Sequence, residues 1–178
     1  MIFPIVTFGN DRLRKKAAPV KAVTPEIKKL AADMLETMYH AEGVGLAAEQ
    51  IGRDEAVCVI DVPAEAEKAD CRETNAAIEM PLVMLNPEIT AASGSQRNNE
   101  GCLSFPEINV MVTRPLEVTA TFTNLGGVRQ TITARGLLAR AIQHEIDHLN
   151  GVLLVDRMSA LQKISVGGKL KRLQAANT

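Results

Sequence analysis

The spacing of apolar residues along the chain predicts three helices. Between residues 25 and 39 they recur every three or four positions, the period of a helix with one buried face. Thr24 suits the N-cap of this helix and Pro25 its first position. A second helix is expected at residues 136–149, stopped by Asn150 and Gly151. A last helix is expected from about Ser159, weakened or broken by glycines at 167 and 168, with these apolar positions: Leu161, Ile164, Leu170 and Leu173.

Other stretches read as strands. Residues 56–60 form an apolar run typical of a buried strand, and residues 81–87 resemble a short strand closed by a turn. Residues 116–122 alternate apolar and polar, and with residues 128–134 they predict a hairpin. Residues 63–80 show no clear period and are expected to be a surface excursion. Because helices and strands do not alternate regularly, the pattern favours an α+β fold over a doubly wound parallel sheet.

Composition narrows the class of protein. A chain of 178 residues suits one domain, residues 1–178, with a C-terminal helix or tail from about residue 159. The formal net charge of -1 and the 3 % aromatic content argue against direct reading of nucleic acid. No apolar run is long enough for a membrane span, and the N-terminus lacks a secretion signal, so we expect a cytoplasmic protein. Three cysteines argue against a disulfide framework.

The stretch Gln-His-Glu-Ile-Asp-His at residues 143–148 carries the clearest chemistry. On a helix, His144 and His148 lie on one face, one turn apart, and can present two imidazoles to one metal ion. Glu145 lies about 100° around the helix, where it can act on a water without ligating the metal. The alternative is a pair of surface or hydrogen-bonded core histidines. Two of the 3 histidines fall in this pattern, and the third, His40, is expected to be structural.

A catalytic metal site needs a third protein ligand, and Cys102 is the best candidate. It follows a glycine in a segment expected to be a loop between strands, where a thiolate can turn inward. The alternative is that Cys102 is an inert small apolar residue, the role that suits Cys58 in its apolar strand. Cys71, in the surface excursion, is expected to be incidental.

A third stretch, Gly-Val-Gly-Leu-Ala-Ala-Glu-Gln at residues 43–50, follows the first helix. Its small residues would let an extended peptide lie against the main chain, as in strand addition. Gln50 offers an uncharged amide donor that suits a developing oxyanion. The alternative is a glycine-rich turn followed by the start of a helix.

Together the three stretches resemble, in order and approximate separation, the three signature motifs of the peptide deformylases. The second motif is Glu-Gly-Cys-Leu-Ser at residues 100–104, and the similarity runs from about residue 5 to residue 160. The resemblance implies a fold with mixed or antiparallel sheets around a central metal-binding helix. It also implies a metal-dependent hydrolase that removes the N-formyl group from the formylmethionine of nascent polypeptides.

The resemblance assigns a role to each candidate residue. Cys102, His144 and His148 would ligate one divalent metal, with a water completing a tetrahedral site; Fe²⁺ is the implied physiological metal and Zn²⁺ a slower substitute. Glu145 would act as general base and then general acid, and Gln50 and the backbone N–H of Leu103 would hold the oxyanion. Four residues would bind substrate, Gly45 by main-chain pairing and the others by lining the methionine pocket: Val44, Gly45, Leu137 and Ala141. Glu100 and Arg114 would form an ion pair that steadies the cysteine loop.

Some features depart from the family pattern. Asn109 stands where bacterial members often carry a basic residue, and Arg140 adjoins the expected pocket. The resemblance implies a transient ribosome contact through the C-terminal helix. The glycines at 167 and 168 argue against docking there, and a solvated charged face is the alternative for its basic residues: Lys163, Lys169, Lys171 and Arg172.

Two other functions remain open from the sequence. The first is a zinc endopeptidase of the His-Glu-x-x-His type, which usually takes His or Glu as third ligand. The second is a catalytically altered relative that binds N-terminal peptides, or a structural metal site, which would need a fourth protein ligand.

Overall fold

The computed structural model describes residues 1–177 and has an α+β fold, as the sequence predicted. The strands are β1 (Gly45–Ala47), β2 (Val57–Ile60), β3 (Leu82–Ser93), β4 (Gln96–Cys102), β5 (Phe105–Arg114), β6 (Glu117–Thr123) and β7 (Arg129–Arg135). The α-helices are α1 (Pro25–His40), α2 (Ala69–Asn75), α3 (Gly136–Leu149), α4 (Ala160–Ser165) and α5 (Gly167–Ala176). Short 3₁₀ helices are η1 (Asp11–Arg14), η2 (Ala48–Ile51), η3 (Ala64–Ala66) and η4 (Leu154–Arg157).

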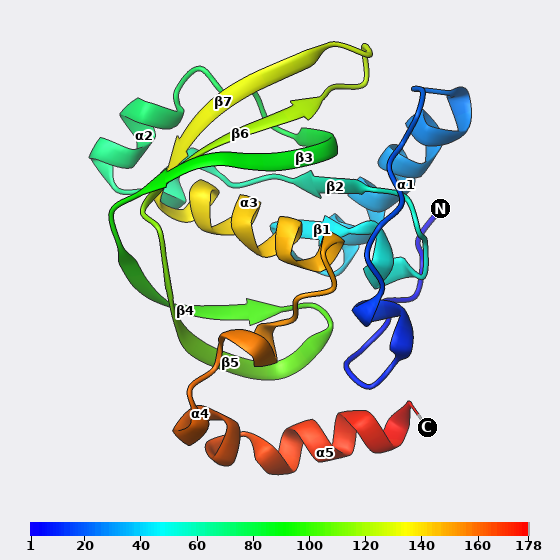
Figure 1. Ribbon diagram of the computed structural model, residues 1–178, viewed down its shortest axis with the longest axis vertical. Helices are drawn as coiled ribbons and strands as arrows, with labels where there is room; N and C mark the ends of the chain where they lie inside the picture. The colour runs from blue at the N-terminus through cyan, green and yellow to red at the C-terminus, as the bar shows by residue number, and fades with distance from the viewer. Residues whose placement is uncertain (178) are drawn as a thin grey trace.

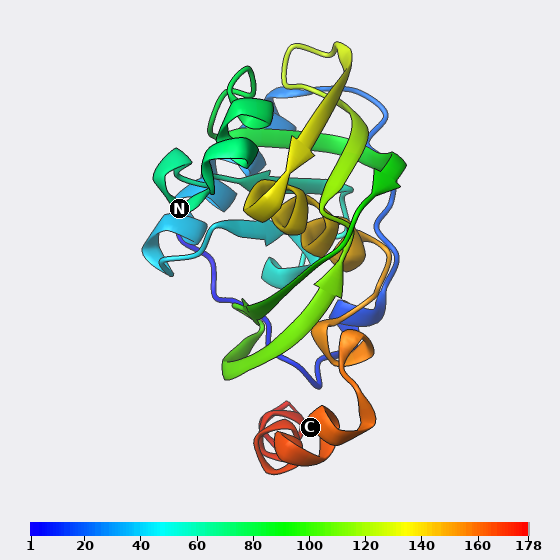
Figure 2. The ribbon, with the colours of Figure 1, turned by 90° about the vertical axis from the view of Figure 1, so that its left-hand side faces the viewer.

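Two sheets enclose the second predicted helix, α3. The larger is a five-stranded antiparallel sheet in the order β1-β2-β3-β6-β7, and the smaller is the antiparallel pair β4-β5. Figure 1 and Figure 2 show α3 running between the five-stranded sheet and the β4-β5 pair. Its apolar face, including Leu138, Ile142 and Ile146, belongs to one buried cluster with residues of the larger sheet. Burial on this scale, at roughly 2 kcal/mol for each large apolar side chain, fixes the helix firmly.

The first helix, α1, matches the prediction closely. The Thr24 side chain accepts a hydrogen bond from the Ile27 amide, and Pro25 occupies the first turn. Leu30, Met34 and Met38 are buried in a cluster that includes residues of β1 and β2. The apolar stripe of this helix is therefore core packing, as expected.

The segment at residues 63–80 is more ordered than the sequence predicted. It contains η3 and α2, and it buries Glu67 and Cys71, which are 7 % and 3 % exposed. The predicted surface excursion is therefore confirmed for most of these residues, which are exposed, but it contains helices that the sequence did not predict. Apolar periodicity did not reveal these helices because α2 is short and because one of the two buried side chains in the segment is the carboxylate of Glu67.

The strand predicted at residues 81–87 is also longer than expected. β3 continues to Ser93 through Pro87, because Asn86 takes a positive φ of 50° and the register with β6 shifts between Leu85 and Glu88. An irregularity of this kind lets a strand accommodate a proline, which cannot donate a ladder hydrogen bond. The hairpin predicted from residues 116–134 is present as β6 and β7.

The C-terminal helix is interrupted, as the two glycines predicted. α4 begins after the Ser159 cap and ends at Ser165, and α5 begins at Gly167. Only part of the expected apolar face is covered: Leu170 is buried, whereas Leu161 and Ile164 are 79 % and 77 % exposed. Within residues 1–177, no helix has the length and apolar character needed to cross a membrane.

Candidate metal centre

Helix α3 brings two histidines to one point. His144 and His148 lie one turn apart, and their Nε2 atoms are 3.2 Å from each other. The Cys102 Sγ atom, at the end of β4, lies 3.3 Å from the His148 Nε2 atom. The three candidate ligand atoms all lie within 4.8 Å of one another. The structure therefore brings together the three residues that the sequence singled out as metal ligands.

The chemistry of these donors fits one divalent cation. A thiolate and two imidazole nitrogens are the donors that zinc and ferrous iron accept in proteins. Burial, helped by the charges of His144 and Arg114, holds the pKa of His148 well below its usual range. The His148 ring is therefore neutral, as a metal ligand must be. Burial opposes a charge on His144, but Cys102 and Glu100 raise the pKa of His144 well above its usual range, so metal binding must displace a proton from that ring. A cation also compensates for the burial of three polar groups that converge on one point.

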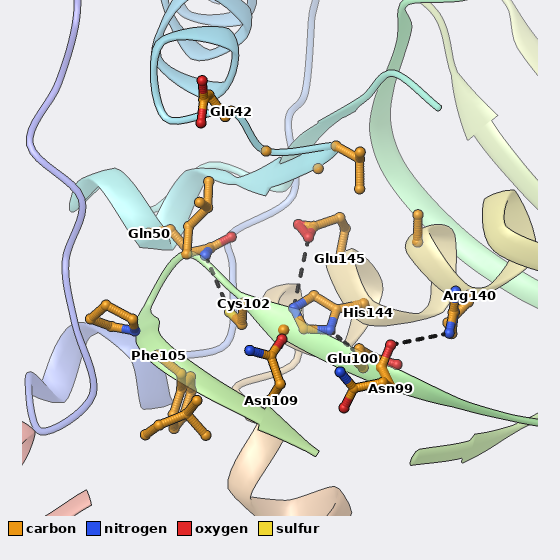
Figure 3. Close-up of a pocket in the computed structure, with 18 of the residues that line it drawn as sticks. Glu42, Gln50, Asn99, Glu100, Cys102, Phe105, Asn109, Arg140, His144 and Glu145 are labelled. Atoms are coloured by element: carbon orange, nitrogen blue, oxygen red, sulfur yellow. Dashed lines mark hydrogen bonds and ion pairs between the residues drawn. The ribbon is translucent and has the colours of Figure 1, made fainter. Parts of the chain in front are cut away.

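Glu145 lies beside this centre without entering it. Its Oε1 atom is 4.0 Å from the His144 Nε2 atom, and its Oε2 atom is buried with no hydrogen-bond partner among the described residues. Figure 3 shows its carboxylate facing His144. Burial raises the pKa of Glu145 to about 7, although the nearby His144 opposes this. A carboxyl group with a pKa near 7 can both accept and return a proton at neutral pH.

The fit between Glu145 and β1 explains one of the signature glycines. A Cβ atom on Gly45 would lie only 3.0 Å from the Cδ and Oε1 atoms of Glu145. Any larger residue at this position would therefore push against the carboxylate. β1 is also the terminal strand of the five-stranded sheet, paired with β2 on one side.

A buried ion-pair network holds His144. Its Nδ1 atom lies 2.5 Å from the Glu100 Oε1 atom, and Arg114 donates two hydrogen bonds to Glu100 at 2.7 and 2.9 Å. Burial opposes ionisation of Glu100, but these hydrogen bonds from His144 and Arg114 lower its pKa to about 2. A carboxylate in this position fixes the tautomer and orientation of the histidine ring.

Sequence reasoning found Glu100 and Arg114 but missed the rest of the network. Arg114 also donates to Asp147 at 3.0 Å, and Arg157 donates twice to the same carboxylate. The signal for Asp147 was its place inside the His-Glu-Ile-Asp-His stretch, three residues after His144. Arg157 gave no signal, because only the tertiary fold brings η4 beside α3.

Ser104, whose role sequence reasoning also missed, helps to hold the amide of Gln50 toward the centre. The Gln50 Oε1 atom accepts a hydrogen bond from the Ala47 amide at 3.0 Å, which fixes the orientation of the side chain. Its Nε2 atom then donates to the Ser104 Oγ atom at 3.0 Å and lies 3.7 Å from the Cys102 Sγ atom. Leu103 follows Cys102 in the turn before β5, and its side chain would be 2.7 Å from a Cβ on Gly43.

A cavity of about 440 Å³ opens onto the centre. All four residues predicted to bind substrate line it, and so do the two residues that depart from the family pattern, Asn109 and Arg140 (Figure 3). The Arg140 guanidinium donates to the Asn99 carbonyl at 3.4 Å. The wall also includes Gln50, Cys102, Leu103, His144 and Glu145. The cavity therefore brings the predicted substrate-binding residues and the metal centre to one surface.

This arrangement defines a class of protein. Two imidazoles and a thiol converge beside a buried carboxylate, and the group faces a cavity large enough for a peptide terminus. These are the features of a metal-dependent hydrolase.

Comparison with known proteins identifies the family within that class. The sequence profile of polypeptide deformylase matches residues 2–164. A peptide deformylase from Nitrosococcus oceani is 43 % identical over 173 residues, covering 97 % of this chain and 96 % of the relative. One from Desulfitobacterium hafniense is 46 % identical over 156 residues, covering 88 % and 94 %.

Comparison with solved structures identifies the same family. The crystal structure of a peptide deformylase from Legionella pneumophila matches with a TM-score of 0.83 and 40 % identity, covering 98 % of each chain. The enzyme from Thermus thermophilus matches with a TM-score of 0.85 and 35 % identity, covering 99 % of each. The chain belongs to the polypeptide deformylase family, and it is an enzyme of the metal-dependent hydrolase class.

Proposed function

We propose that this enzyme removes the formyl group from the N-terminal formylmethionine of newly made polypeptides. Water adds to the formyl carbon, the C–N bond breaks, and formate and a free N-terminal amine are released. The observation that carries the proposal is the convergence of Cys102, His144 and His148 beside Glu145 at one cavity.

The three convergent residues would hold one divalent metal ion. When bound, the metal supplies Lewis-acid chemistry, which makes water acidic enough to react near neutral pH and polarises the carbonyl group. Glu100 accepts the hydrogen bond from the His144 Nδ1 atom and so directs the Nε2 atom toward the metal position. Arg114 holds Glu100 in place through two hydrogen bonds.

Glu145 would move the proton. Its carboxylate takes a proton from the attacking water and then delivers it to the nitrogen of the leaving amine. The pKa of about 7 suits both steps, because the group is neither too weak a base nor too weak an acid at neutral pH. The Gln50 Nε2 atom and the backbone N–H of Leu103 would donate hydrogen bonds to the oxyanion that forms on the formyl oxygen.

The substrate would bind as an added strand. Gly45 lies in β1, the terminal strand of the sheet, so the main chain of a peptide can pair along its open side. Val44, Leu137 and Ala141 line the cavity and would contact the methionine side chain. Asn109 and Arg140, which line the same cavity, would give this enzyme a rim that differs from the bacterial pattern.

We further propose Fe²⁺ as the physiological metal, with Zn²⁺ as a slower substitute, and the cytoplasm as the location. The donor set accepts both metals, and the resemblance to deformylases favours iron. The interruption at the glycines argues against docking through α5, so a transient ribosome contact is proposed for α4, where Leu161 and Ile164 are exposed beside Lys163. We also propose that residues 1–178 form a single catalytic domain; Thr178 lies outside the described residues.

The test is formate release from formyl-Met-Ala-Ser by protein purified without oxygen and loaded separately with Fe²⁺ and Zn²⁺. We expect release with both metals and a higher rate with Fe²⁺. Acetyl-Met-Ala-Ser and an unmodified longer peptide serve as controls, and neither should be cleaved. Cleavage of internal peptide bonds would favour an endopeptidase instead, and no release with either metal would overturn the proposal.

A further inference from the structure

The metal-bearing helix α3 begins without a cap of its own. Arg135 stands at the N-cap and makes no side-chain capping hydrogen bond, and the first turn holds no acidic residue. The first amides of any helix lack partners within the helix and must find them elsewhere. Here the partner is Glu67, whose Oε1 atom accepts from the Leu137 amide at 2.6 Å and whose Oε2 atom accepts from the Leu138 amide at 2.9 Å.

Glu67 is itself held in place by Asn75. The Asn75 Nδ2 atom donates to the Glu67 Oε2 atom at 2.7 Å and to the Arg135 carbonyl at 3.0 Å. The Asn75 Oδ1 atom accepts from the Arg135 amide at 2.8 Å. Glu67 and Asn75, hereafter the Glu67–Asn75 clamp, thus bind both the last residue of β7 and the first turn of α3.

The clamp is closely packed against the start of the helix. Gly136 has a φ of 70°, and a Cβ atom there would lie 2.7 Å from both the Glu67 Oε1 atom and the Cys71 Sγ atom. Glu67 is 7 % exposed, so its charge is largely removed from water. A buried carboxylate at a helix N-terminus interacts favourably with the helix dipole as well as with the amides.

The clamped turn carries part of the cavity wall. Leu137 donates its amide to the clamp, and its side chain lines the cavity together with Arg140 and Ala141. His144 lies seven residues further along, roughly 10 Å at the rise of an α-helix. The C-terminal half of the helix has its own anchor, because Arg114 ties Glu100 and Asp147 together there.

We propose that the Glu67–Asn75 clamp positions the first turn of α3 and thereby sets the selectivity of the cavity for the methionine side chain. The inference rests on the proposed deformylase function, in which Leu137 and Ala141 contact that side chain. Glu67 and Asn75 are positioning residues and touch neither substrate nor metal. Loosening the clamp therefore weakens binding of the methionine side chain and leaves the proton transfer by Glu145 intact.

The experiment compares the full-length, metal-loaded enzyme with its Glu67→Gln variant, which keeps the size of the side chain and removes its charge. Substrates are formyl-Met-Ala-Ser and formyl-Ala-Ala-Ser, since alanine lacks the long side chain that Leu137 is proposed to contact. We expect KM for the methionine substrate to rise about 10-fold, as for loss of a hydrogen bond to a charged group, with kcat changing less than about twofold. The preference for methionine over alanine should fall by a similar factor.

Three readouts separate positioning from general damage. Glu65→Gln, an exposed glutamate on η3, is the matched control and should behave as the parent enzyme. Metal content and the pH profile of kcat should be unchanged in Glu67→Gln. Asn75→Ala, which keeps the Glu67 charge, should show a smaller shift in the same direction and provides the test if Glu67→Gln does not fold. An unchanged methionine preference in the folded variants, or a fall in kcat and metal content instead, would overturn the proposal.

Amide exchange keeps this test distinct from the proposed function. The Leu137 and Leu138 amides should exchange faster in Glu67→Gln than in the parent protein, whether or not the protein releases formate. If the two amides exchange faster in Glu67→Gln but the parent protein releases no formate, the clamp stands and the assigned substrate is wrong. Unchanged exchange in an active enzyme would overturn the clamp alone.

Discussion

Glu49 should make the stability of this enzyme depend on pH in an unusual direction. The side chain is 2 % exposed, and neither carboxyl oxygen has a hydrogen-bond partner among the described residues. Burial, together with the charges of Glu145 and Asp54, raises the pKa of Glu49 from its ordinary 4.5 to about 8. The folded protein therefore holds a proton on Glu49 at neutral pH that the unfolded chain releases.

The size and sign of the effect follow from this difference. Below pH 4.5 the folded and the unfolded protein both hold the proton, so Glu49 does not make the free energy of unfolding depend on pH there. As the pH rises from 4.5 to about 8, the folded state loses stability by up to about 1.4 kcal/mol for each pH unit. Relaxation of the protein around the charged carboxylate reduces this loss, so we expect the free energy of unfolding to fall by roughly 3 kcal/mol over the whole interval. Glu49→Gln removes the titration and should stabilise the protein progressively over this interval.

Urea unfolding of metal-loaded parent and Glu49→Gln proteins, at a series of pH values from about 5 to about 8.5 that covers most of the interval between the two pKa values, measures the effect. The difference in the free energy of unfolding between the two should grow in favour of the variant as the pH rises. Effects of pH on the metal site occur in both proteins and largely cancel in that difference. Glu79→Gln, at an exposed position, should show no such trend. A difference that stays constant across the series would refute the reasoning.

Three further predictions concern the metal centre. Gly45→Ala should lower kcat on the order of 100-fold in steady-state assays, because the new Cβ atom would displace the Glu145 carboxylate; an unchanged kcat would show that the close approach does not matter. Arg114→Met should destabilise the protein by about 3–5 kcal/mol in urea unfolding, because Glu100 would stay buried after losing its arginine partner, whereas Asp147 would keep its ion pair with Arg157; a neutral effect would mean that the network contributes little. Chelation should lower the melting temperature by about 10 °C relative to protein with free metal at about 1,000 times Kd, reversibly on adding metal back; an unchanged melting temperature would contradict metal binding to the folded state alone.

The sequence predicted the elements whose signals are local. Apolar periodicity and caps defined α1 and α3, and the alternation in residues 116–134 defined the β6-β7 hairpin. The convergence of His144 and His148 was predictable because spacing on a helix determines which side the two residues face. Cys102 was a candidate from its glycine-containing segment, and the family motif favoured it over an inert cysteine, since nothing within the sequence alone says that β4 ends beside α3.

The parts that sequence reasoning missed depend on long-range contacts. Glu67 caps α3 through the amide of Leu137, 70 residues later, so the helix start shows no capping residue of its own. Ser104 and Arg157 act through partners on other elements, and β3 passes Pro87 because the sheet tolerates an irregularity there. In each case a contact between distant segments, rather than a local preference, decides the structure.

Proton transfer by Glu145 at a metal held by other residues is the centre of the proposed mechanism, and one comparison tests it most directly. Formate release from formyl-Met-Ala-Ser and bound metal per chain are measured for the parent enzyme, Glu145→Gln and Cys102→Ser. We predict that Glu145→Gln keeps its bound metal but loses release by at least about 1,000-fold, whereas Cys102→Ser loses both. Turnover that survives in Glu145→Gln, or metal that is lost with the glutamate, would contradict this mechanism.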